Sequence, residues 1–132
     1  MGAKLMEKKT RRRHGLLTSF RFALVGLAYL FRTQRNARIH LILGAAACAL
    51  AGWLGISLIA WAILIMTIAG VLILEGLNTA IEAVVDLASP EIHPLAKIAK
   101  DISAGMVLIA AIGSVAVGIL ILGIPLWARV FH

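Results

Sequence analysis

The sequence predicts an all-α integral membrane protein, in which an amino-terminal amphipathic surface helix is followed by three transmembrane helices. Two properties of the 132-residue chain indicate this class: 61% of its residues are hydrophobic and only 14% are charged. Globular domains average about 45–50% apolar and about 25% charged residues. The mean hydropathy of +0.98 therefore indicates a lipid environment. A large soluble catalytic domain is excluded, and the single cysteine excludes a disulfide framework.

The amino-terminal part of the chain is first basic and then amphipathic. Residues 1–15 form a basic tail, with six Lys or Arg among the first thirteen residues, and we expect anionic lipid headgroups to attract it. Residues 16–36 form the expected surface helix, because Arg21 interrupts an otherwise apolar run. The same interruption argues against a cleaved signal peptide. The tail is short and adjoins a membrane helix, so no nucleic-acid partner is expected.

Residues 39–74 carry no formal charge and are too long for one span. As a single helix these 36 residues would measure about 54 Å, whereas the hydrocarbon core of a bilayer is about 30 Å thick. Gly55 can end one helix, and Ser57 can cap the next. The sequence therefore predicts a first span at about 39–54 and a second at about 58–87.

A third span at about 96–126 follows a polar connection at 86–101. Ten Lys and Arg residues lie in 1–38 and two in the connection, while Arg129 lies beyond the third span. The positive-inside rule places the amino terminus and the connection in the cytoplasm. His40, at the start of the first span, is expected to lie at the membrane interface and is assigned no chemistry.

Five polar side chains share one face of the second span, and we call them the polar stripe. At 100° per residue they fall within an arc of about 100°, while the rest of the helix is apolar. Carboxylates on such a helix repel each other and lose hydration, so a divalent cation or a cationic partner is expected to compensate them. The stripe consists of Glu75, Asn78, Thr79, Glu82 and Asp86.

The third helix supplies candidate partners on one face, where Lys97, Lys100 and Asp101 lie together. Lys100 could pair with the carboxylates of the stripe or hold a phosphate as a point charge. Oxygen ligands of this kind suit Mg²⁺, which usually takes one or two carboxylates plus substrate phosphates. A structural network of ion pairs between the two helices is the alternative, and spacing alone does not decide between them. His93, next to Pro94, is either a loop histidine or a ligand.

These residues resemble the signature of the small prokaryotic diacylglycerol kinase family, which includes the undecaprenol kinases. The resemblance rests on the runs EGLNTAIEAVVD at 75–86 and HPLAKIAKD at 93–101, and it covers about Ser19 to Leu122. The run RIH at 38–40 and the run KIAKDISAG at 97–105 look closer to the undecaprenol kinase branch than to the enterobacterial diacylglycerol kinase.

The resemblance implies that residues 16–132 form one membrane kinase domain, which assembles as a homotrimer in the bacterial inner membrane with its active site in the cytoplasm. It implies transfer of the γ-phosphate from MgATP to a lipid hydroxyl. The lipid would be undecaprenol, giving undecaprenyl phosphate, or alternatively diacylglycerol, giving phosphatidic acid. Glu75 would act as the general base, and Glu82 would bind the Mg²⁺ ion. The implied ATP-binding residues are Asn78, Glu82, Glu91, His93, Lys100 and Asp101.

One position departs from the family pattern. The family usually carries a second metal-binding Glu just before the first span, and this sequence has Gln34 there. An amide oxygen is a weaker ligand for Mg²⁺ than a carboxylate, so no metal role is carried over to Gln34. An alternative from another class also stays open, namely a non-catalytic membrane scaffold whose polar stripe only locks the helices together.

Overall fold

The computed structural model describes residues 15–89 and 93–131, which contain helices and no strand. Residues 1–14 of the basic tail lie outside the described residues, as does Glu91, one of the expected ATP contacts. In chain order the elements are α1 (Leu16–Thr33), α2 (Arg35–Leu54), α3 (Leu58–Ala88), α4 (Pro94–Gly118), the short π-helix η1 (Ile119–Gly123) and α5 (Ile124–Phe131).

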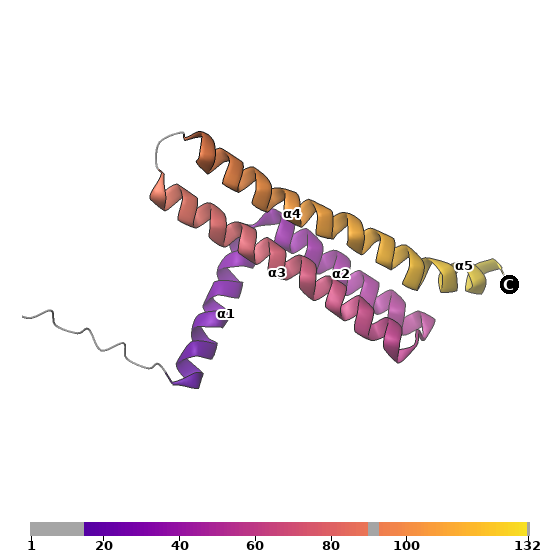
Figure 1. Cartoon of the computed structure of the whole chain (residues 1–132). Coiled ribbons are helices and arrows are strands. Elements are labelled where there is room, and N and C mark those ends of the chain that lie inside the picture. The colour runs from indigo at the N-terminus through magenta and orange to yellow at the C-terminus, as the bar shows by residue number, and fades with distance from the viewer. Residues whose placement is uncertain (1–14, 90–92, 132) are drawn as a thin grey trace, which may run out of the picture.

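Helices α2, α3 and α4 lie side by side as an antiparallel bundle, whereas α1 leaves the bundle at a steep angle (Figure 1). Among the described residues, four helical segments are long and apolar enough to cross a membrane: α1, α2, α3 and the continuous helix Pro94–Phe131. Because α1 runs across the direction of the other three, it suits a position on the membrane surface. The predicted all-α membrane architecture is therefore confirmed.

The tight turn between α2 and α3 forms at the predicted residues. Gly55 has φ +66° and ψ +45°, the left-handed conformation that favours glycine at the end of a helix, and its N–H donates to Ala51 O. The Ser57 hydroxyl accepts a hydrogen bond of 3.2 Å from the Ala60 N–H and so caps α3. Both predicted roles are confirmed, and together they reverse the chain within three residues.

The end of the bundle near this turn is closed by apolar packing and by one arginine. Ala51, Leu64 and Leu122 form its buried core. Arg129 on α5 donates a hydrogen bond of 2.9 Å to Trp53 O, and its guanidinium lies 4.6 Å from the centroid of the Trp53 ring. These contacts attach the carboxyl-terminal helix to the end of α2.

Helices α2 and α3 approach each other closely at Gly44, which is buried. A Cβ atom placed on Gly44 would lie 2.9 Å from Cγ2 of Ile68 on α3. Small residues permit such close contact between membrane helices, where packing and hydrogen bonds stabilise association. Gly52, on the same helix, has no heavy atom within 4 Å of the corresponding position.

We expect Gly44→Ala to destabilise the bundle by about 1–3 kcal/mol, the usual range for overpacking, because Ile68 must move to admit the methyl group. The matched variant Gly52→Ala should cause no loss, since its methyl group meets open space. Unfolding in mixed detergent micelles, followed by circular dichroism, measures both variants. Equal stability of the two would contradict the importance of this close approach.

Candidate active site

The polar stripe lies on the last four turns of α3, at the end of the bundle where α3 ends and α4 begins, which we call the connection end (Figure 1). The 17 residues Leu58 to Leu74 that precede it carry no charge and correspond to about 25 Å of helix. That length is close to one hydrocarbon thickness. The stripe therefore begins where the apolar part of α3 ends.

Glu75 is the first residue of the stripe and the most deeply buried, with 3% of its surface exposed. Its Oε1 lies 3.3 Å from Nε2 of His40, which reaches it from α2. The two groups are close enough for an ion pair when the imidazole is protonated. The geometry of this contact is not that of a hydrogen bond, so Oε1 has no hydrogen-bond partner among the described residues. A buried carboxylate oxygen is thus left able to accept a proton or a hydrogen bond.

Asn78 links the stripe to α4. Its Nδ2 donates a hydrogen bond of 3.0 Å to Oε1 of Glu82, one turn further along α3. Its Oδ1 accepts a hydrogen bond of 2.6 Å from the Ser103 hydroxyl, which is buried on α4. Because both ends of the amide are engaged, the orientation of Asn78 is fixed, and Asn78 in turn holds Glu82 in one position.

The outer part of the stripe is neutralised by lysine. Nζ of Lys100 lies 2.6 Å from Oδ1 of Asp86, which joins α4 to the last turn of α3. Of the two possibilities that the sequence left open for Lys100, the structure shows the pairing with a carboxylate of the stripe. Lys97 and Asp101 pair with each other at 2.5 Å across one turn of α4, and both are exposed. Exposed pairs of this kind contribute little to stability. The side chains of both pairs are partly or fully exposed, so a charged solute can reach them.

The remaining predicted residues have local roles in the fold. The Thr79 hydroxyl donates to Glu75 O, the usual intrahelical bond of a membrane threonine. Nδ1 of His93 accepts a hydrogen bond of 3.2 Å from the Leu95 N–H and caps α4, with Pro94 at the first helical position. Gln34 occupies the junction between α1 and α2, where its side chain makes no capping hydrogen bond.

The donor set at the connection end fits a magnesium ion held jointly with phosphate oxygens. Within residues 15–89 and 93–131 there is no group of three or more His, Cys, Asp or Glu residues that could hold a metal alone. Glu82 nevertheless offers one oriented carboxylate, and a carboxylate has about four lone-pair sites, of which Asn78 uses one. One or two carboxylates plus substrate phosphates are the usual ligands of Mg²⁺.

Two residues of the site were missed by the sequence analysis. His40 was expected at the interface without chemistry, yet its Nε2 lies 3.3 Å from the buried oxygen of Glu75. Ser103 falls outside the arc occupied by Lys97, Lys100 and Asp101, yet it orients Asn78. The position of His40 at the edge of a charge-free run was a signal for its role. For Ser103, the sequence of α4 contained no such signal.

Comparison with known proteins places these residues in context. The model of the family described as "Prokaryotic diacylglycerol kinase" matches residues 21–122. A diacylglycerol kinase of Synechocystis is 54% identical over 104 residues, which cover 78% of this chain and 59% of the relative. The undecaprenol kinase of Bacillus subtilis is 46% identical over 106 residues, which cover 78% of this chain and 84% of the relative. A diacylglycerol kinase of Escherichia coli is 45% identical over 69 residues, which cover 52% of this chain and 57% of the relative. The match thus spans less than two thirds of the first relative's length.

We expect Ser103→Ala to loosen the connection end, because it removes the donor that orients Asn78. Hydrogen bonds between membrane helices contribute about 0.6 kcal/mol on average and up to about 1.7 kcal/mol, so the loss should fall in that range. Ser114→Ala is the matched control, since the Ser114 hydroxyl donates only within α4, to Ala111 O. Unfolding in mixed micelles compares the two variants, and equal losses would contradict an interhelical role for Ser103.

Proposed function

The chain belongs to the prokaryotic diacylglycerol kinase family, and from this we propose that it transfers the γ-phosphate of ATP to the hydroxyl of a membrane lipid. One observation carries the proposal: Glu75 is 3% exposed and has a buried oxygen without a hydrogen bond, at the depth where the apolar part of α3 ends. A lipid hydroxyl at the membrane boundary and a soluble nucleotide can meet only at such a depth. A buried carboxylate oxygen without a hydrogen bond costs free energy, and a purely structural side chain gains nothing in return.

The proposed reaction assigns one step to Glu75. As the lipid hydroxyl oxygen forms its bond to the γ-phosphorus, the bond between that phosphorus and the oxygen of ADP breaks, and Oε1 of Glu75 takes the hydroxyl proton. The products are ADP and the lipid phosphate. Phosphoryl transfer depends mainly on positioning and on neutralised charge, and the buried setting of Glu75 supports the first requirement.

The neighbouring residues are proposed to hold the nucleotide. Glu82, oriented by Asn78, is the proposed ligand of the Mg²⁺ ion, which supplies charge neutralisation at the phosphates when bound. Lys100 is the proposed phosphate contact, and its short contact with Asp86 keeps it at the connection end. Asp101, His93 and the undescribed Glu91 complete the proposed nucleotide site at the start of α4 and in the connection.

The preferred lipid is undecaprenol, with diacylglycerol as the alternative. The RIH run at 38–40 supports undecaprenol, because its histidine is the residue that contacts Glu75, and the undecaprenol kinase of Bacillus subtilis matches over 84% of its length. The 54% identity to the diacylglycerol kinase of Synechocystis favours the alternative. The proposed location is the bacterial inner membrane with the connection end in the cytoplasm, supported by the twelve Lys and Arg residues on that side.

We expect Glu75→Gln to abolish transfer at every Mg²⁺ concentration, because an amide cannot take the hydroxyl proton. Glu82→Gln is the matched comparison: it should raise the Mg²⁺ requirement, since a neutral oxygen binds the ion more weakly, and added Mg²⁺ should restore part of its activity. Transfer of labelled phosphate from ATP to lipid in micelles measures both. Unchanged transfer by a well-folded Glu75→Gln variant would contradict the role of Glu75 as the base, whereas no transfer by the unsubstituted chain would favour the scaffold alternative.

We further propose a homotrimer. One chain offers a single oriented metal-binding carboxylate, Glu82, and no cluster of three metal-ligating side chains among its described residues, so neighbouring chains are proposed to complete the site. The expected mass by light scattering, after subtraction of detergent, is three times the 14.1 kDa of the chain. A fully active preparation with the mass of one chain would contradict this assembly.

A further inference from the structure

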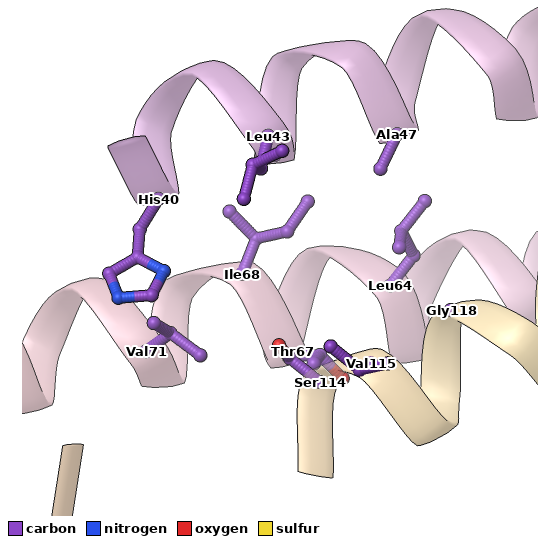
Figure 2. Close-up of a pocket in the computed structure, with 11 residues that line it drawn as sticks. His40, Leu43, Ala47, Leu64, Thr67, Ile68, Val71, Ser114, Val115 and Gly118 are labelled. Carbon is purple, nitrogen blue, oxygen red and sulfur yellow. The ribbon is translucent and has the colours of Figure 1, made fainter. Parts of the chain in front are cut away.

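A pocket of about 230 Å³ lies among α2, α3 and α4, directly beside the candidate active site. Figure 2 shows His40 at one end of this pocket and Gly118 at the other, with Ile68 and Leu64 along its length. The His40 imidazole that lines the pocket is the same group that lies 3.3 Å from Oε1 of Glu75. One end of the pocket is therefore separated from the proposed base only by the His40 imidazole, and the other end lies in the apolar part of the bundle.

Away from His40 the pocket has no donor to offer a ligand. Its lining is apolar except for the hydroxyls of Thr67 and Ser114. The Thr67 hydroxyl donates to Ile63 O at 2.8 Å, and the Ser114 hydroxyl donates to Ala111 O at 2.7 Å, each within its own helix. A hydroxyl has one proton to donate. A polar ligand atom placed beyond His40 would therefore stay unsatisfied, at a substantial free-energy cost.

The dimensions suit one hydrocarbon chain. An apolar cavity of about 150 Å³ holds a benzene molecule, which has six carbon atoms. On this scale 230 Å³ holds about nine carbon atoms, which is nearly two isoprene units. Gly118 lines the far end, and no heavy atom lies within 4 Å of a Cβ position built on it.

We propose that this pocket binds the first isoprene units of a polyprenol, with the hydroxyl end of the lipid at His40 and Glu75; the inference rests on the lipid kinase function proposed above. In a polyprenol the carbon that carries the hydroxyl is attached directly to hydrocarbon. A diacylglycerol instead carries two ester groups within a few atoms of its hydroxyl. Those esters would enter a pocket whose hydroxyl donors are already used, so the pocket selects against them.

The test fills the far end of the pocket with Gly118→Leu. Gly118 has ordinary helical backbone angles and open space beside it, so the helix accepts a side chain there. Gly113→Leu is the matched control, because Gly113 lies on the same helix, also faces open space and does not line the pocket. For each variant, kcat and KM are measured in micelles with a polyprenol and with a diacylglycerol.

We expect Gly118→Leu to raise the KM for the polyprenol by about tenfold to a hundredfold, because several buried methylene equivalents are displaced. Its kinetics with diacylglycerol should match those of Gly113→Leu. Equal polyprenol kinetics in the two variants, or equal losses with both lipids, would overturn the proposal. Transfer to neither lipid by the unsubstituted chain would instead contradict the proposed function.

A binding measurement without turnover separates the two questions. A polyprenol with a photoreactive group on its second isoprene unit, counted from the hydroxyl, should crosslink to α4 near Gly118 in the unsubstituted protein and in Gly113→Leu, and should lose that crosslink in Gly118→Leu. This crosslink is expected whether or not phosphate is transferred. Its absence from the unsubstituted protein would exclude the pocket as the site of the isoprene chain.

Discussion

The arrangement of the helices depends on how the charges and polar groups of α3, an otherwise apolar helix, are paired with groups from its neighbours. Two polar side chains that α3 buries or half-buries at the connection end meet groups from other helices: Glu75 meets His40 on α2, and Asn78 meets Ser103 on α4. The exposed Asp86 meets Lys100. A polar group in a membrane has no water to satisfy it, so these contacts fix how the three helices are placed relative to one another. Apolar packing holds the other end.

One buried polar atom, Oε1 of Glu75, is left without a hydrogen bond among the described residues, and it lies at the candidate site. Asn78 has both ends of its amide engaged, and Glu82 accepts a hydrogen bond from it. Oε1 of Glu75 lies beside a histidine but accepts no hydrogen bond among the described residues. If the network were only structural, its most buried member would be the one expected to be fully satisfied. The most buried member, Glu75, is instead the one without a hydrogen bond. This is the arrangement expected when the surrounding residues are held in place so that one group can react.

The sequence predicts features that depend on one helix at a time. Helical periodicity identified the polar stripe, and local backbone preferences identified the turn at Gly55 and Ser57, because both need only neighbouring residues. The pairing of Lys100 was predictable from charge. The contacts of His40 and Ser103 were not, because they depend on the rotation and height of α2 and α4 against α3. Those are set by close approaches such as Gly44 against Ile68, which no single-helix pattern reveals.

The same packing explains why a buried carboxylate and an apolar pocket occur together. Gly44 brings α2 against α3, which places His40 one turn earlier on α2 next to Glu75. At the end of the pocket opposite His40, Gly118 on α4 fills none of the space that remains. A larger residue there would close the hollow without touching the polar stripe. The proposed recognition of the lipid chain and the proposed base therefore occupy separate places in this fold, so a substitution along the pocket is expected to change the preferred lipid while Glu75, Asn78 and Glu82 keep their positions.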